Sequence, residues 1–280
     1  MQNWSGCSGM NIGDVTALKD TRDNNVYAVA KLADNKCWMI ENLRLADKDS
    51  NNNDINLSST NTHNPSLPLT NSWWYSSAND SDTKPTSNHL SATTDPTATA
   101  WCQTNSSNCD DQSMLATNNT TLFTNNTSSS YNTGSNVYSY GNYYNWYSAT
   151  AGHGKYGSSY GSGYTSPGDI CPAGWHLPTG GSATAEFGAL DVAMGGTGAY
   201  QSTAEASNRW RSYPNNFVYS GYVNGSSVSN RGAYGYYWSS SAGNSSSAYY
   251  LVFYSSGVNP GTGNVGSKYY GSMARCVAGV

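Results

Sequence analysis

Charged side chains are scarce in this chain of 280 residues, where they make up 11% of the sequence, against about 25% in ordinary soluble domains. Lys and Arg together number 13, and the formal net charge is −4. The chain therefore lacks the basic surface that binding to a phosphate backbone requires. We expect no nucleic-acid partner.

Long apolar stretches are also absent. No run of the sequence approaches the roughly 18 residues of a membrane-spanning helix, which argues against membrane insertion of this chain. The first residues are polar and show no basic-then-apolar secretion signal. We expect that a signal or anchor precedes this segment in the natural protein, which would then be secreted or displayed on the cell surface.

Cysteine pairs with the Cys-x-x-Cys spacing of zinc and redox sites do not occur. An even number of cysteines instead fits three disulfides in an oxidising compartment, and buried free thiols are the alternative. Six cysteines allow 15 pairings, among which we predict a local bond between Cys102 and Cys109. The six are Cys7, Cys37, Cys102, Cys109, Cys171 and Cys276.

Aromatic residues are abundant. The 23 Tyr and 9 Trp argue against disorder, because disordered chains contain few aromatics. In the last fifty residues, Trp238, Leu251, Phe253 and Cys276 alternate with Tyr, Ser, Gly and Asn. Antigen-binding loops favour this mixture, since Tyr provides contact area at low entropic cost and the small polar residues form adaptable hydrogen bonds. The pattern favours binding over catalysis.

The N-terminal part contains recognisable secondary structure. Residues 26–32 are rich in apolar and β-branched side chains and predict a strand. Asp34 and Asn35 then signal a turn. Residues 37–43 fit either a short helix or a second extended segment. Residues 46–135, by contrast, are rich in Asn, Ser and Thr and are predicted to be a partly ordered insertion, because a structureless loop of this length is unusual in a compact domain.

One helix is predicted from the spacing of its apolar residues. Ser182 is expected to cap its N-terminus, with Glu186 near the positive end of the helix dipole. Gly195 and Gly196 are expected to end it. The apolar face consists of Ala183, Phe187, Leu190 and Met194.

A strand is predicted at residues 249–254, where side chains on one face should point to the core and those on the other to solvent. The core-facing set is Tyr249, Leu251 and Phe253. The outward set is Tyr250, Val252 and Tyr254.

Five ordered motifs resemble the Fibrobacter succinogenes major paralogous domain family. They are Asp-Thr-Arg-Asp-Asn-Asn-Val-Tyr at 20–27, Trp-Met-Ile-Glu-Asn-Leu at 38–43, Cys-Pro-Ala-Gly-Trp-His-Leu-Pro at 171–178, Tyr-Trp-Ser-Ser-Ser at 237–241 and Arg-Cys-Val at 275–277. The similarity covers about 14–45 and 136–280, which leaves the insertion at 46–135 outside it.

The resemblance implies an α+β domain with a C-type lectin-like fold. Such a fold has a mixed, mostly antiparallel sheet, two helices and long loops, and residues 1–280 would form one domain that carries the 46–135 insertion. The resemblance also implies that Cys171 and Cys276 lie near each other. The positions of Cys7 and Cys37 in the same scaffold favour a disulfide between them.

The C-terminal region is similar to the variable proteins of diversity-generating retroelements, in which adenine replacement changes Asn codons to Tyr, Ser, Gly and others. This similarity implies a variable region at 212–280 and a non-enzymatic protein that binds varied extracellular protein or glycan targets. A static surface adhesin or structural domain is the alternative, and the oligomeric state stays open. The candidate contact residues are Tyr219, Tyr222, Tyr234, Tyr236, Asn244, Tyr250, Val252, Tyr254, Gly257, Gly261, Gly263, Tyr269 and Tyr270.

Catalytic and metal sites are less well supported. Residues 157–161 fit a Gly-x-Ser-x-Gly motif around Ser159, but this motif requires a strand before it and a helix after it. His176 and Cys171 lack further zinc ligands. The fold's sugar-binding calcium site would need carboxylates that residues 259–260 do not supply, and no reactive cysteine pair of the formylglycine-generating kind is evident. We predict no enzyme activity and no cofactor, with a structural calcium as an option at residues 47–53, whose alternating oxygen donors resemble a calcium loop.

Overall fold

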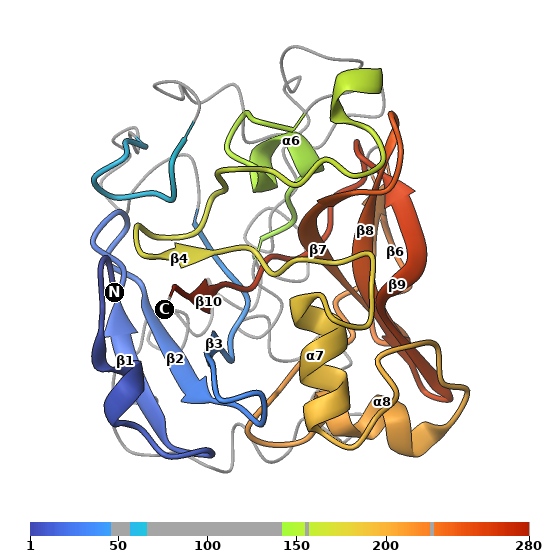
Figure 1. The fold of residues 1–280 in the computed structure, drawn as a ribbon, viewed down its shortest axis with the longest axis horizontal. Coiled ribbons are helices and arrows are strands. Elements are labelled where there is room, and N and C mark those ends of the chain that lie inside the picture. The colour runs from blue at the N-terminus through green and yellow to red at the C-terminus, as the bar shows by residue number, and fades with distance from the viewer. Residues whose placement is uncertain (46–56, 66–141, 155–156, 225–226, 280) are drawn as a thin grey trace.

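The computed structural model describes residues 1–45, 57–65, 142–154, 157–224 and 227–279 (Figure 1). The helices are Trp146–Ala149 (α6), Glu186–Ala193 (α7) and Ala204–Arg211 (α8), with 3₁₀ turns at Gly6–Gly9 (η1) and Ser158–Tyr160 (η5). The strands are Val15–Lys19 (β1), Val26–Lys31 (β2), Cys37–Met39 (β3), Trp175–His176 (β4), Tyr222–Asn224 (β5), Ser227–Ser229 (β6), Tyr234–Ala242 (β7), Ser247–Tyr254 (β8), Gly257–Ser267 (β9) and Val277–Ala278 (β10). The expected α+β class is confirmed, with antiparallel pairing throughout the named strands.

A five-stranded sheet joins the two ends of the chain. Its strand order is β1-β2-β3-β10-β4. In β10, Val277 pairs with Trp38 on one side and with His176 on the other. The N-terminal strands β1 to β3 and the C-terminal strand β10 therefore belong to one sheet (Figure 1).

Strand β2 is buried on both faces. Tyr27 and Val29 belong to one hydrophobic cluster, while Ala28 and Ala30 belong to a second. Because successive side chains of a strand point to opposite faces, the sheet lies between two cores. This explains why residues 26–30 form a continuous apolar run, and the predicted strand is confirmed as β2. The left-handed φ of Asn35, 66°, agrees with the predicted turn, and β3 shows that the segment after it begins extended rather than helical.

Helix α7 begins later than predicted. It starts at Glu186 with Ala185 as the N-cap residue, whereas Ser182 accepts a hydrogen bond from the Ala185 amide one turn earlier. Thr179 explains the shift: its Oγ1 accepts from the Glu186 amide at 3.0 Å, and the Glu186 carboxylate accepts from the Thr179 amide at 2.9 Å. This reciprocal pair caps the helix from a residue outside it. Gly195, with φ of 90°, follows its C-terminus as expected.

Two of the three predicted disulfides lie in the described residues, and both are present. Cys7 is bonded to Cys37, and Cys171 to Cys276. The predicted bond between Cys102 and Cys109 lies outside the described residues, as does most of the 46–135 insertion. Of that insertion, residues 57–65 are described, and Thr62 forms a bridge with Pro172.

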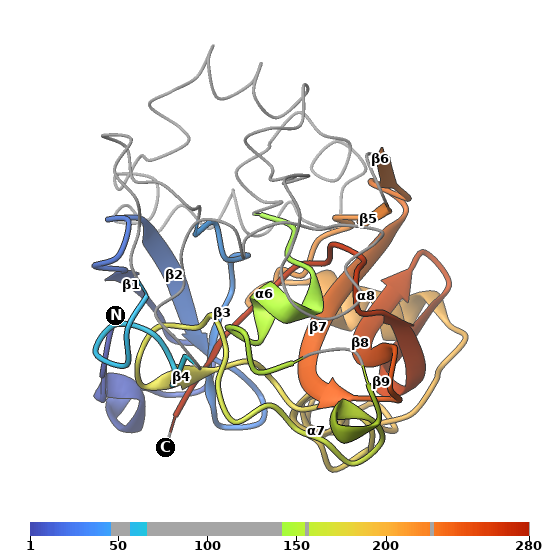
Figure 2. The same ribbon diagram turned by 90° about the horizontal axis from the view of Figure 1, so that it is seen from above.

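The remaining sheets lie on the other side of the molecule from β1 and β2 (Figures 1 and 2). Strands β7, β8 and β9 form a three-stranded sheet in that order, and β5 pairs with β6. Helices α7 and α8 contribute Phe187 and Trp210 to the core that Leu251 and Phe253 of β8 also share. No helix among the described residues is long and apolar enough to cross a membrane.

Candidate ligand-binding face

The three-stranded sheet has one core face and one outer face. Tyr237 is fully buried, as are Leu251 and Phe253 of the adjacent strand. The register pairs Tyr234 with Tyr254 and Trp238 with Tyr250, so these four side chains share the opposite face. The alternation therefore predicts the inner position of residues 251 and 253 correctly.

Tyrosine side chains from three strands and two loops meet on the outer face. We call this set the tyrosine face. It consists of Tyr200, Tyr222, Tyr234, Tyr236, Tyr250, Tyr254, Tyr269 and Tyr270.

Ring contacts connect the members of the tyrosine face one to the next. Tyr254 lies 5.0 Å from Tyr234 between ring centroids. Tyr234 stacks on Tyr236 at 5.9 Å, and Tyr236 meets Tyr222 at 5.0 Å and Tyr250 at 5.5 Å. These distances lie in the range that aromatic pairs prefer. The rings are thus held by one another as well as by the sheet.

The other end of the tyrosine face lies beside β5. Tyr222 meets Tyr270 at 5.2 Å, and Tyr270 meets Tyr269 at 4.9 Å. On the same face, Tyr250 packs edge-on against its cross-strand neighbour Trp238 at 5.9 Å, and Trp238 is fully buried. Tyr250 therefore connects the tyrosine face to one of the two cores.

Tyr200 belongs to the tyrosine face although it is not among the contact residues predicted from the sequence. Its hydroxyl lies 2.8 Å from the hydroxyl of Tyr254, and its side chain is 54% exposed. The next residue, Gln201, forms a bridge with Val258 of β9, which brings this loop to the sheet edge. Tyr200 precedes the predicted variable region, and no signal in its local sequence indicates the contact.

The other members are half-buried rather than fully exposed. Burial raises the pKa of Tyr250 to about 12. The hydrogen bond between the Tyr254 and Tyr200 hydroxyls raises the pKa of Tyr254 to about 12 as well. Both phenols are therefore protonated at neutral pH, and each can donate and accept hydrogen bonds. The face offers neutral aromatic area edged with hydroxyl groups.

Glycines beside the rings act through their lack of a side chain. A Cβ at Gly266 would lie 2.5 Å from the Tyr250 ring, and one at Gly257 would lie 2.9 Å from the Tyr254 hydroxyl. Gly257, which we expected to contact ligand, is buried. Gly257 therefore contributes by leaving space for the Tyr254 side chain.

Several predicted contact residues do not reach the outer surface. Tyr219 is only 5% exposed, because its ring packs 5.5 Å from Phe253 and beneath the Arg211 guanidinium at 4.0 Å. Val252 shares the outer face but is only 4% exposed, since it lies between Tyr236 and Asn259 in register. Val252 therefore lies on the predicted face, but neither Val252 nor Tyr219 is exposed as a ligand-contact residue would be.

Three further predicted residues lie apart from the tyrosine face. Asn244 is exposed in the turn between β7 and β8, where its Oδ1 accepts from the Ser246 amide. Gly261 is buried, with φ of 83°, and its carbonyl accepts from Gly181. Gly263 is exposed farther along β9.

The predicted core position of Tyr249, which follows from simple alternation, also differs from the structure. Tyr249 is half-buried rather than part of the core. Its ring covers the backbone at Gly181, where a Cβ would lie 3.0 Å from the ring.

Other candidate chemistry is not assembled in the described part of the chain. Ser159 is exposed on η5, which no strand precedes directly. Cys171 is in a disulfide, and the His176 ring instead contacts Glu186 at 2.8 Å. The described residues contain no group of three His, Cys, Asp or Glu side chains placed to hold a metal. The calcium-like segment 47–53 lies outside the described ranges.

We expect Glu186→Gln to lower the free energy of unfolding by about 2 kcal/mol near pH 5. Burial of Glu186 favours its neutral form, but hydrogen bonds from His176, Lys36 and Thr179 outweigh it and lower its pKa to about 2. A carboxyl with a lowered folded-state pKa stabilises above its unfolded pKa, 4.5, and loses this contribution as the pH falls toward 2. Urea unfolding at pH 5 and at pH 2.5 should therefore show that the free energy of unfolding differs more between variant and parent at pH 5.

Glu205→Gln is the matched control for this prediction. Glu205 is 87% exposed and lies 3.8 Å from Arg209, so its removal should change stability by less than about 0.5 kcal/mol. The stabilising role of the Glu186 carboxylate would be contradicted if Glu186→Gln lost as little unfolding free energy as the control, or if its loss were larger at pH 2.5 than at pH 5.

Comparison of the chain with protein-family models, with curated proteins and with solved structures finds no match in any of the three.

Proposed function

We propose that this protein is a non-enzymatic binding protein, secreted or displayed on the cell surface, whose tyrosine face contacts an extracellular macromolecule. The observation that carries the proposal is the convergence of Tyr200, Tyr222, Tyr234, Tyr236, Tyr250, Tyr254, Tyr269 and Tyr270 on one face of a rigid sheet. Tyrosine is enriched in the energetically dominant parts of protein interfaces. The two described disulfides agree with an oxidising, extracellular environment.

A protein partner is favoured over a glycan. The tyrosine face is neutral and extends from the Tyr200 loop to the Tyr269–Tyr270 loop. Flat aromatic surfaces with hydroxyl edges are typical of antibody contact surfaces, which bind proteins with moderate shape complementarity. A glycan partner is the alternative, and the binding experiment described below tests both.

We further propose the C-type lectin-like fold and diversification of residues 212–280 by a retroelement. Support comes from the five motifs, from the disulfide between Cys171 and Cys276, and from the half-buried tyrosines of residues 212–280 that lie over a buried framework. A reverse transcriptase gene and an Asn-rich template repeat beside the coding sequence would be expected. Their absence would leave the alternative, a static adhesin that uses the same face.

The division between the two faces of β7 can be tested with neighbouring tyrosines. Tyr236→Ser removes a half-buried ring of the tyrosine face and should cost about 1 kcal/mol of unfolding free energy. Tyr237→Ser removes a fully buried ring together with the hydrogen bond that its hydroxyl accepts from the Val218 amide. It should cost about 3–5 kcal/mol of unfolding free energy. Urea unfolding followed by tryptophan fluorescence measures both.

Binding is then tested with a displayed library in which Tyr222, Tyr236, Tyr250 and Tyr254 vary among Tyr, Ser, Asn and Gly. Panning against serum albumin, and separately against a glycan array, should select folded binders whose affinity disappears when the four positions are all changed to Ser. If most library members fail to fold, or if equal costs are found for Tyr236→Ser and Tyr237→Ser, the proposed binding face is wrong.

A further inference from the structure

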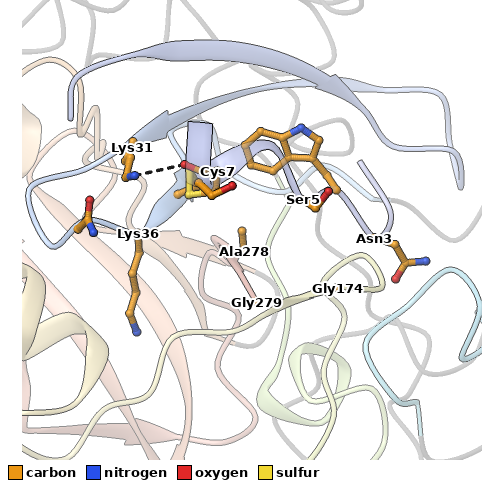
Figure 3. A pocket seen from close by; sticks show the side chains of 12 residues that line it. Asn3, Ser5, Cys7, Lys31, Lys36, Gly174, Ala278 and Gly279 are labelled. Carbon is orange, nitrogen blue, oxygen red and sulfur yellow. Dashed lines mark hydrogen bonds between the residues drawn. A yellow bond between two sulfur atoms is a disulfide. The ribbon is translucent and has the colours of Figure 1, made fainter. Parts of the chain in front are cut away.

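A cavity of about 620 Å³ lies between the N-terminal segment and the end of β10 (Figure 3), on the side of the molecule away from β7, β8 and β9 (Figures 1 and 2). The N-terminal segment with Asn3, Ser5 and Cys7 forms one side, and Gly174 and Gly279 lie on the other. Its volume is typical of small-molecule sites. The lining residues are Asn3, Trp4, Ser5, Cys7, Ser8, Lys31, Asn35, Lys36, Cys37, Gly174, Ala278 and Gly279.

The walls of this cavity are held in place by covalent and backbone links. The disulfide between Cys7 and Cys37 ties the N-terminal segment to β3. The Asn3 amide donates to the Ala173 carbonyl at 2.6 Å, and the Gly279 amide donates to the Gly174 carbonyl at 2.7 Å. The cavity is therefore preformed, which lowers the entropic cost of binding.

One cation in the wall retains hydrogen-bonding capacity. Lys31 is 8% exposed, and its ammonium donates to the carbonyls of Cys7 at 3.2 Å and Met10 at 3.0 Å. An ammonium has three N–H donors, so one remains for a ligand within the described structure. The second lysine, Lys36, is paired with Glu186 at 2.8 Å. Among the described residues, no Asp or Glu side chain lines the cavity, and the charge of this lining favours an anion.

The rest of the lining suits a hydroxylated ring. Trp4, which stacks on Trp175 at 5.8 Å with 17° between the planes, supplies apolar aromatic surface. Asn3, Ser5 and Ser8 add amide and hydroxyl groups. An indole beside several small polar groups matches a sugar, which has an apolar C–H face and hydroxyls around its edge.

We propose that this cavity binds an acidic sugar, a uronic acid whose carboxylate meets Lys31 and whose ring lies beside Trp4. This site is separate from the tyrosine face and independent of any diversification. It would give the protein a constant saccharide-binding function alongside a variable one.

The test is isothermal titration of the intact protein with glucuronate, with the methyl ester of glucuronate at its carboxyl group, and with glucose. We expect glucuronate to bind at least about tenfold more tightly than the two neutral sugars, because a hydrogen bond to a charged group is the stronger kind. Lys31→Met should reduce glucuronate binding to the level of the ester. Lys19→Met is the matched control and should change it by less than about threefold, because Lys19 is an exposed lysine of β1 that does not line the cavity.

Equal binding of glucuronate and its ester by the parent protein would overturn the proposal, and so would undetectable binding of glucuronate. Because that comparison uses the unaltered chain, it decides the matter even if Lys31→Met fails to fold. Tyr236→Ser should leave glucuronate affinity unchanged, and a loss there would contradict the separation of the two sites.

Discussion

Asp20→Asn is expected to lower the free energy of unfolding by about 3–5 kcal/mol, because it leaves a buried guanidinium without its counter-charge. Asp20 and Arg22 form an ion pair at 2.6 Å, with both side chains fully buried. Burial opposes the charged form of Asp20, but the Arg22 charge outweighs it and lowers the pKa of Asp20. Arg22 also donates to Thr62 at 3.1 Å and to the Ile170 carbonyl at 2.6 Å. The pair therefore joins three segments that are distant in sequence.

The loss is large compared with the about 5–15 kcal/mol that stabilises a typical domain. Urea unfolding at pH 7, followed by tryptophan fluorescence, should show it directly. The double variant Asp20→Asn/Arg22→Met removes both charges and should be more stable than Asp20→Asn alone. A single variant that loses less than about 1 kcal/mol, or a double variant less stable than the single one, would contradict this account.

Replacing both Cys171 and Cys276 by Ala is expected to cost about 4 kcal/mol, because their disulfide closes a loop with a sequence separation of 105 residues. Both residues are fully buried in one of the two cores. The bond also fastens the segment before β4 to the strand β10, which completes the five-stranded sheet. Without it, the unfolded chain gains conformational freedom and the C-terminal strand loses its covalent tie.

The variant that lacks Cys7 and Cys37 provides the comparison. That disulfide has a sequence separation of 30, so its removal should cost less, about 3 kcal/mol. Thermal unfolding under non-reducing conditions would rank the two variants. The opposite ranking would show that local packing, and not loop length, determines the contribution of each bond.

The two sites differ in how they depend on these bonds. The Cys7–Cys37 disulfide forms part of the cavity wall, so its loss should impair the proposed binding of glucuronate as well as stability. The tyrosine face instead rests on Trp238 and on the close approach of Gly266 to Tyr250. Its geometry is therefore set by packing within the sheet.

The sequence alone predicts several local features correctly. The strand at 26–32, the turn at Asn35, the end of α7 at Gly195 and the inner position of Leu251 and Phe253 all follow from residue type and spacing. The two described disulfides follow from the resemblance of the motifs rather than from spacing. These predictions succeed because each depends on near neighbours in the chain or on positions within the scaffold that the motifs imply.

Features that require contacts between distant segments were decided by the tertiary structure. Local alternation could not show that Tyr219 packs beneath Arg211, or that Val252 lies covered between Tyr236 and Asn259. Nor could local alternation predict that Tyr200 contacts Tyr254, because that contact depends on the bridge between the Tyr200 loop and β9.

The chain by itself thus determined which residue types are available for binding: many tyrosines, few charges and a cysteine framework. Only the folded structure decided which tyrosines share a surface and that Lys31 lines a cavity beside Trp4. The physical reason is that burial and side-chain neighbours are set by pairing between remote strands, whose register a local pattern does not encode.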